Sequence, residues 1–196
     1  MRIGLDIDGV LMDDDEFVLA HTTKYAFENN IQDTFKNLSA FTYQKLIWDE
    51  NIIDDYRQTY LWDYYKNDKP RKFANEVIKK IRKKGHEIII LTTRWTATED
   101  TSNGKRVRDI TLKWLKQNDI EYDDIIFTKG DKSKECIEYK IDLIIDDSPR
   151  VIEEAKNIVK YVFCYDNRYN IDIKDENIIR VFSWYDIYNK IEGLEK

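Results

Sequence analysis

Apolar and other residues alternate along the first stretch of the chain. Residues 2–8, RIGLDID, place Ile3, Leu5 and Ile7 at every second position, and Gly9 follows. An alternation of period two is typical of a β-strand, and glycine is a frequent stop signal. The pattern therefore predicts a strand that ends among carboxylates.

The spacing changes between residues 71 and 84. Phe73, Val77 and Ile81 recur every fourth position, and Gly85 follows the last of them. Apolar residues at this spacing occupy one face of a helix, and glycine commonly follows a helix end. We therefore predict a helix that stops at Gly85.

Strand-like and helix-like segments then alternate to the end of the chain. The predicted strands are HEIIILTTR, YDDIIFT, IDLIIDDSP, KYVFCYD and IIRVFSW. The predicted helices lie around 107–115, over 132–140, after Pro149 and over 184–194. Such alternation predicts an α/β fold, a Rossmann-like parallel sheet with helices on both faces.

Residues between the first strand and this alternation follow a different pattern. Helix-like segments rich in Tyr, Trp and Phe occupy 14–30, 42–49 and 53–67, with no good strand among them. We interpret 13–68 as a helical cap, inserted into a core domain formed by 1–12 and 69–196. An insertion at this point lies over the carboxyl edge of the sheet, where open α/β sheets bind ligands.

Composition limits the classes of partner. The 196 residues include 32 Lys and Arg against 38 Asp and Glu, a net charge of −6. This balance argues against a general binder of nucleic-acid polymers or membrane surfaces, which needs a basic face. It permits a small anionic ligand at a locally positive site. An oligomer is possible, and its state cannot be read from the sequence.

Cysteine content and hydropathy favour a cytoplasmic protein. The only cysteines, Cys136 and Cys164, lie among apolar residues and form no CxxC motif, which favours reduced thiols. The N-terminus lacks the apolar core of a signal peptide. We find no apolar run near the ~20 residues that a transmembrane helix needs.

Four chemically active signals fall where predicted strands end. They are Asp6 with Asp8, the run Thr92-Thr93-Arg94, Lys132 within a Gly-Asp-Lys sequence, and Asp146 with Asp147. The carboxyl ends of parallel strands converge on one crevice. Clustered carboxylates demand a cation, and all-oxygen ligands with retained water suit Mg²⁺. Carboxylates, a metal ion and a lysine are the groups that phosphoryl transfer uses.

These signals resemble a known family. DIDGV, LTTR, GDK and LIIDDSP are similar, in this order, to the four motifs of the haloacid dehalogenase (HAD) superfamily. The resemblance covers residues 1–10 and 71–182, with the predicted insertion where that superfamily places its C1 cap. A lone DxDG is a weak signal in an Asp-rich chain, but four motifs at four strand ends are specific.

The resemblance implies catalytic roles for four residues. Asp6 is the nucleophile that forms an aspartyl phosphate, and Asp8 is the general acid and base. Thr92 donates a hydrogen bond to the phosphoryl group, and Lys132 neutralises nucleophile and phosphate. Because the superfamily's dehalogenases lack the second Asp, Asp8 indicates a phosphatase or phosphomutase.

The resemblance also implies a metal site. Mg²⁺ is expected on Asp6, Asp146 and the backbone carbonyl of Asp8, with Asp147 assisting through water. A structural role remains open, because Asp146 and Asp147 also suit the cap of the following helix. For the motif lysine, Lys132 is favoured over Lys129 and Lys134.

Within the superfamily, the chain resembles the 5'-nucleotidase and deoxyribonucleotidase group. The shared features are a small helical cap, the sequence Asp131-Lys132-Ser133 and the sequence Ile145-Asp146-Asp147. That group holds the base with cap aromatics. The candidates here are Phe41, Tyr43, Trp48, Tyr56, Tyr60, Trp62, Tyr64 and Tyr65, most of which we expect in the cap core.

The second motif departs from that group. It often shows Thr-Ser or Thr-Ala where this chain has Thr92-Thr93-Arg94-Trp95, and we take Thr93 and Arg94 as candidate substrate-binding residues. Arg94 is available for a second anionic group of the substrate. We expect a Mg²⁺-dependent phosphatase for nucleoside or deoxyribonucleoside 5'-monophosphates. The alternatives are a phosphatase for a sugar phosphate or another small phosphomonoester, a phosphomutase, and a non-catalytic phosphate-binding protein.

Overall fold

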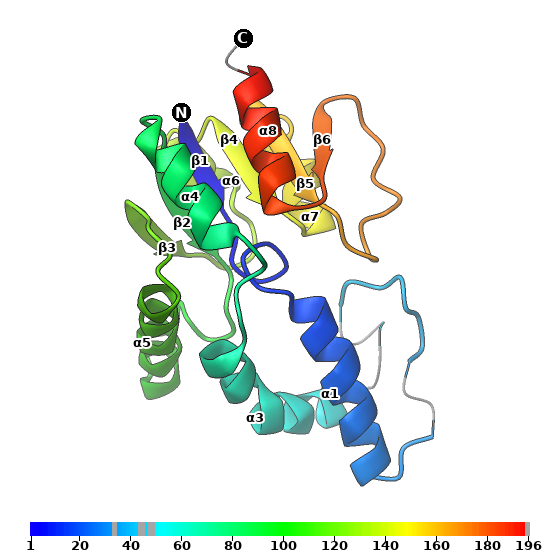
Figure 1. Ribbon diagram of the computed structural model, residues 1–196. Helices are drawn as coiled ribbons and strands as arrows, with labels where there is room; N and C mark the ends of the chain where they lie inside the picture. The colour runs from blue at the N-terminus through cyan, green and yellow to red at the C-terminus, as the bar shows by residue number, and fades with distance from the viewer. Residues whose placement is uncertain (33–34, 43–45, 47–49, 195–196) are drawn as a thin grey trace.

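A six-stranded parallel sheet forms the centre of the molecule (Figure 1). The computed structural model describes residues 1–196 except 33–34, 43–45, 47–49 and 195–196. The strand order is β3-β2-β1-β4-β5-β6. The strands are β1 (Arg2–Leu5), β2 (Glu87–Thr92), β3 (Asp124–Phe127), β4 (Leu143–Asp146), β5 (Tyr161–Tyr165) and β6 (Ile178–Val181). Every predicted strand is present, with somewhat shorter bounds.

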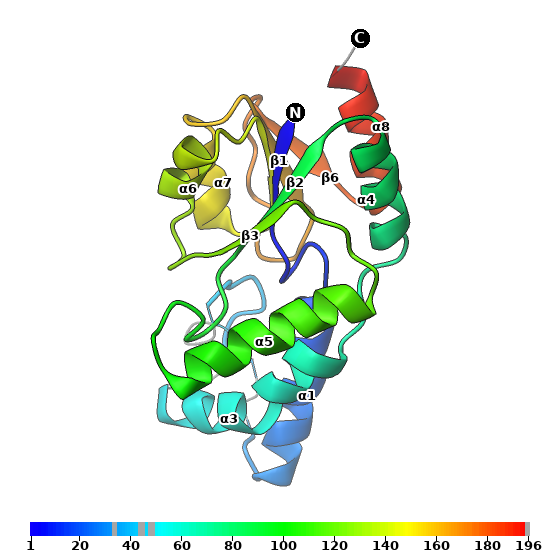
Figure 2. The same cartoon turned by 90° about the vertical axis from the view of Figure 1, so that its left-hand side faces the viewer.

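Helices cover both faces of this sheet, as the alternating pattern predicts (Figure 2). One face carries α4 (Ala74–Lys83) and α8 (Trp184–Leu194), and the other carries α6 (Ser133–Glu138) and α7 (Pro149–Ala155). The helix α5 (Ser102–Gln117) lies below β3 and packs against α3 (Glu50–Asn67). The predicted α/β fold is therefore confirmed, and α4 ends where Gly85 adopts a φ of +86°.

The strand order places the first motif next to the fourth. β1 pairs with β2 on one side and with β4 on the other, so Leu5 lies between Ile90 and Ile145. These strands are almost entirely buried, as parallel strands covered on both faces should be. Residues that follow β1, β2 and β4 therefore emerge side by side at one edge.

The helical segment between β1 and α4 has an apolar cluster of its own. This helical segment contains α1 (Asp14–Glu28) and α3, which lie below the sheet in Figure 1. Val18, Tyr25, Ile53 and Tyr56 are buried between them. The predicted helices over 14–30 and 53–67 are confirmed, whereas most of 42–49 lies outside the described residues. The division into a core of 1–12 and 69–196 and a cap of 13–68 stays a prediction.

The chain enters and leaves this helical segment at one place. Met12 and Pro70 form an antiparallel bridge, and the Arg71 backbone N–H donates to the Leu11 carbonyl at 2.7 Å. The Arg71 guanidinium also pairs with Asp13 at 2.7 Å. The two connections are thus joined to each other by backbone and side-chain contacts.

Two further sequence expectations bear on the fold. Cys136 and Cys164 are both buried, and neither forms a disulfide. No helix among the described residues combines the length and the apolar character needed to cross a membrane.

Candidate active site

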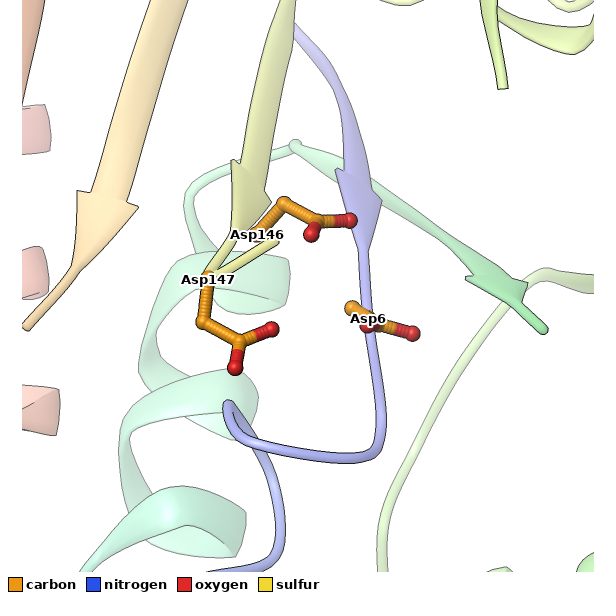
Figure 3. Close-up of side chains that lie close together, drawn as sticks. All are labelled: Asp6, Asp146 and Asp147. Carbon is orange, nitrogen blue, oxygen red and sulfur yellow. The ribbon is translucent and has the colours of Figure 1, made fainter. Parts of the chain in front are cut away.

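Three carboxylates from two adjacent strand ends face one another (Figure 3). Asp6 follows β1, Asp146 is the last residue of β4, and Asp147 comes directly after it. Each offers an oxygen within 4.8 Å of the oxygens from the other two. The convergence predicted from the strand ends therefore brings the first and fourth motifs together.

Lys132 supplies the positive charge of this cluster. Its Nζ lies 2.6 Å from Asp146 Oδ2 and 3.0 Å from Asp6 Oδ1, and its side chain is 3% exposed. Lys132 is the residue that directly precedes α6. Lys129 and Lys134 are exposed at the surface, so the geometry selects Lys132 among the three candidates.

Burial and mutual repulsion shift the acid equilibria in this cluster. Burial raises the pKa of Asp6 to about 7. The positive charge of Lys132 opposes this shift, and the negative charges of Asp146 and Asp8 add to it. Burial, followed by the charges of Asp14 and Asp146, raises the pKa of Asp147 well above its usual range. The single positive charge of Lys132 is therefore too small to neutralise three carboxylates.

The donor set fits a hard divalent cation. All three ligand candidates are carboxylates, and a set of oxygen donors with room for water suits Mg²⁺. Gly9 makes room for one of them, because a Cβ at this position would overlap the Asp147 carboxylate. Gly9 also has a φ of +82°, which glycine adopts without strain. The Asp8 side chain lies outside the cluster, which leaves only its carbonyl for the predicted metal role.

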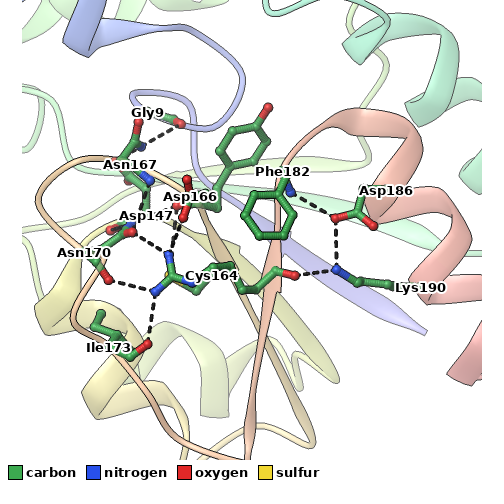
Figure 4. A network of polar contacts seen from close by, with 12 residues as sticks. Gly9, Asp147, Cys164, Asp166, Asn167, Asn170, Ile173, Phe182, Asp186 and Lys190 are labelled. Atoms are coloured by element: carbon green, nitrogen blue, oxygen red, sulfur yellow. Dashed lines mark hydrogen bonds and ion pairs between the residues drawn. The ribbon is translucent and has the colours of Figure 1, made fainter.

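A loop after β5 fixes Asp147 (Figure 4). Asn167 Nδ2 donates to Asp147 Oδ2 at 3.1 Å, the Tyr169 hydroxyl donates to the same oxygen, and Asn170 Nδ2 donates to the Asp147 carbonyl at 2.9 Å. Arg180 of β6 in turn donates to the side-chain and backbone oxygens of Asn170. The role of this loop could not be predicted from the sequence, because only the pairing of β5 with β4 and β6 brings its residues to Asp147.

The predicted acid–base residue has a different environment. Arg94 Nε donates to Asp8 Oδ2 at 3.0 Å, and Arg94 Nη2 donates to Asp8 Oδ1 at 2.8 Å. The Arg94 side chain is completely buried. The expectation that Arg94 binds a second anionic group of the substrate is therefore corrected, because its guanidinium is engaged by Asp8 and does not line the cavity.

The two threonines after Leu91 point to different surroundings. Thr92 is fully buried, and its Oγ1 has no hydrogen-bond partner among the described residues. Thr93 lines the cavity beside Asp6 and shares a 2.6 Å hydrogen bond with Thr128 Oγ1. Since side chains alternate along a strand, only one of the two can face Asp6. Of the two, Thr93 is the one whose side chain lines the cavity that contains Asp6.

A cavity of about 520 Å³ extends from these carboxylates to the helical segment. Ligand sites commonly have ~300–1,000 Å³. Its polar end includes Asp6, Asp8, Lys132 and Asp147. Its aromatic lining consists of Phe17, Phe41, Tyr56, Tyr64, Tyr65 and Trp95.

Some of the candidate aromatic residues of the cap line this cavity and others do not. Phe41, Tyr56, Tyr64 and Tyr65 line the cavity, whereas Tyr60 packs in the helical cluster and Trp62 stacks on Arg106. Tyr43 and Trp48 lie outside the described residues. Phe17 of α1 and Trp95 after β2 also line the cavity and were not among the candidates.

One acidic side chain of the cavity, Asp14, was not among the candidates from the sequence. Asp14 begins α1 and lines the cavity, and its buried Oδ1 has no hydrogen-bond partner among the described residues. Burial, followed by the charges of Asp8 and Asp15, raises the pKa of Asp14 to about 8. Its position beside the carboxylate cluster shows that it belongs to the site as well as to the first turn.

Comparisons with known proteins agree with this geometry. A family model, "5' nucleotidase, deoxy (Pyrimidine), cytosolic type C protein", matches residues 1–195. The Bacillus subtilis protein named "Putative nucleotidase YqfW" is 25% identical over 193 residues, which cover 94% of this chain and 90% of that protein. A Chlorobaculum tepidum protein named "Putative 5'(3')-deoxyribonucleotidase" is 29% identical over 83 residues, 42% of this chain and 37% of that protein.

A solved structure supports the fold at low sequence identity. A haloacid dehalogenase-like protein from Agrobacterium tumefaciens superposes with a TM-score of 0.69 at 13% identity, covering 100% of this chain and 99% of that one.

Proposed function

The chain belongs to the family of 5' nucleotidases, deoxy (Pyrimidine), cytosolic type C, and on that premise we propose that it hydrolyses nucleoside 5'-monophosphates through an aspartyl phosphate with Mg²⁺. Membership makes it a HAD-type phosphatase of the nucleotidase class with a small phosphorylated nucleotide as substrate. The observation that carries the proposal is a carboxylate and lysine cluster at one end of an aromatic-lined cavity.

The metal site in this proposal consists of Asp6, Asp146 and Asp147. A bound Mg²⁺ would supply the positive charge that these carboxylates lack and would stabilise negative charge on the transferring phosphoryl group. Lys132 remains between Asp6 and Asp146, where it holds the Asp6 carboxylate in place.

In the first step, an Asp6 carboxylate oxygen attacks phosphorus. The bond from phosphorus to Asp6 forms as the bond to the 5' oxygen breaks, and Asp8 gives its proton to that leaving oxygen. In the second step, water attacks phosphorus, Asp8 takes the proton of that water, and the bond to Asp6 breaks. Asp8 ends with the proton with which it began, and the products are a nucleoside and phosphate.

The aromatic end of the cavity supports the nucleotide assignment. Phe17, Tyr56 and Trp95 present aromatic surface in the same cavity as the carboxylates. Planar bases stack on aromatic rings, a contact worth roughly 1–3 kcal/mol per base in single-stranded nucleic-acid complexes. A sugar phosphate has no planar group to use this surface.

The test is phosphate release from a panel of ribo- and deoxyribonucleoside 5'-monophosphates and sugar phosphates, with Mg²⁺ or with EDTA. We expect release from nucleotides that needs Mg²⁺ and is lost in Asp6→Asn. Asp109→Asn is the matched control, because Asp109 is an exposed partner of Lys105 on α5. Faster release from sugar phosphates would contradict the substrate class, and full activity of Asp6→Asn would contradict the mechanism.

A further inference from the structure

Arg94 holds both oxygens of the Asp8 carboxylate. The two bonds, Nε to Oδ2 at 3.0 Å and Nη2 to Oδ1 at 2.8 Å, form the parallel fork that fixes a carboxylate in one plane. A lysine in the same place would supply charge without this orientation. The fork therefore determines where Asp8 points, besides compensating its charge.

The guanidinium is itself fixed from three directions. Arg94 Nη1 donates to Thr111 Oγ1 of α5 at 3.1 Å, and Nη2 lies 3.0 Å from Met12 Sδ. Its Cζ lies 4.4 Å from the centre of the Tyr65 ring of α3. Contacts with α5, α3 and the connection after β1 therefore orient Arg94, and Arg94 in turn orients Asp8.

Tyr64 adds a third donor. Its hydroxyl donates to Asp8 Oδ1 at 2.8 Å, the oxygen that also accepts from Arg94 Nη2. A carboxylate has about four acceptor sites, two on each oxygen. Both sites of Oδ1 are occupied, and Arg94 Nε occupies one site of Oδ2. Among the described residues, the remaining site is therefore on Oδ2.

We infer that Arg94 and Tyr64 are positioning residues that confine proton exchange by Asp8 to its Oδ2 oxygen. The inference rests on the proposed function, in which Asp8 protonates the leaving oxygen and later accepts the proton of water. Both transfers then pass through the same lone pair, and Asp8 needs no rotation between the two steps. In this arrangement Arg94 and Tyr64 act on the reaction through Asp8.

The test compares two leaving groups. A nucleoside leaves as an alkoxide that needs a proton, whereas p-nitrophenolate leaves as a stable anion. Tyr64→Phe removes one hydroxyl, and Arg94→Lys keeps the charge but loses the fork. Their matched controls are Tyr60→Phe, which removes a hydroxyl that donates to Glu28, and Arg82→Lys, which changes an arginine paired with Asp123.

We expect kcat/KM for the best nucleotide to fall about 10-fold in Tyr64→Phe and about 100-fold in Arg94→Lys, within the ~10²–10⁴-fold that general acid–base catalysis supplies. For p-nitrophenyl phosphate it should fall less than about 3-fold, because phosphoryl transfer to Asp6 then needs no acid. KM should change little. In an Asp8→Asn background, Tyr64→Phe should have no further effect, as expected of residues that act through one another.

Equal losses on both substrates would overturn the positioning role, because a general structural defect lowers both together. Unchanged kcat/KM for the nucleotide would also overturn it. Wild-type protein that releases phosphate from neither substrate would reject the proposed function itself, and the positioning role with it. Thermal unfolding of each variant shows whether a loss of activity follows from misfolding. If Arg94→Lys does not fold, the result for Tyr64→Phe, which is the smaller change, decides whether the positioning role holds.

Discussion

Lys132 Nζ lies 2.6 Å from Asp146 Oδ2, and both side chains are almost completely buried. Burial alone would lower the pKa of Lys132, but the charges of Asp146 and Asp6 raise it above its ordinary value. The lysine is therefore charged at neutral pH. It is a fixed positive charge beside the proposed nucleophile.

The first prediction removes this charge. Lys132→Met should lower phosphate release from nucleotides by at least about 10²–10³-fold, the range for loss of one transition-state donor. Lys129→Met, which removes an exposed lysine three residues earlier, should leave the rate within about twofold of wild type, since surface substitutions have small effects. Initial rates with saturating Mg²⁺ measure both. Comparable rates for the two variants would contradict the assignment of Lys132.

The second prediction concerns Gly9. Gly9→Ala should destabilise the protein by more than the roughly 1–2 kcal/mol cost of a left-handed alanine, because its Cβ would displace the Asp147 carboxylate. Gly85→Ala is the matched control, since Gly85 has a similar φ of +86° with nothing within 4 Å of a Cβ. Chemical denaturation measures both losses. Equal losses in the two variants would show that Asp147 moves aside without cost.

The third prediction links Mg²⁺ binding to pH. The raised pKa of Asp6, about 7, means that the folded protein without metal retains a proton that the unfolded chain loses near pH 3.8. Metal binding must displace that proton and also any proton on Asp147, whose pKa is raised too, so apparent Mg²⁺ affinity should rise by at least about tenfold per pH unit up to pH 7. Isothermal titration calorimetry across pH 5.5–8.5 measures this. An affinity independent of pH below 7 would contradict the proton displacement.

The fourth prediction concerns Asp14 in EDTA. Its folded pKa, about 8, lies above the unfolded value of 3.8, so its contribution to stability is complete below pH 3.8 and is lost as pH rises to about 8. Asp14→Asn removes this loss. The melting temperature of Asp14→Asn relative to wild type should therefore rise between pH 5 and pH 8 and remain constant above. A difference that stays constant or declines over this range would contradict the raised pKa.

Strand ends were the part of the site that the sequence could predict. Asp6 and Asp146 follow runs of buried residues, and parallel strands bring such ends together regardless of detailed packing. The choice between Thr92 and Thr93 needed the register of β1 against β2, which determines which threonine shares a side with Asp6. A shift of one residue reverses this choice, and apolar periodicity at a strand end does not resolve it.

The partner of Arg94 could not be predicted for a different reason. Its pairing with Asp8 depends on how α3 and α5 dock beside the strand ends, since Tyr65 and Thr111 orient the guanidinium. Phe17 likewise lies on an apolar face of α1 that is indistinguishable in sequence from a core face. These contacts arise from the placement of whole helices, about which local patterns carry little information.

The bridge between Met12 and Pro70, reinforced by the Arg71–Asp13 ion pair, has a consequence for how the molecule can vary. The chain leaves the strand edge and returns to it at the same spot. The residues between these two points can therefore be replaced by a segment of another length without a change in the order of the strands. Because Tyr64 and Tyr65 at the end of this segment contact Asp8 and Arg94, a chimera that keeps these two tyrosines and exchanges the helical residues before them should retain the sheet and the orientation of Asp8 while changing the substrates it accepts.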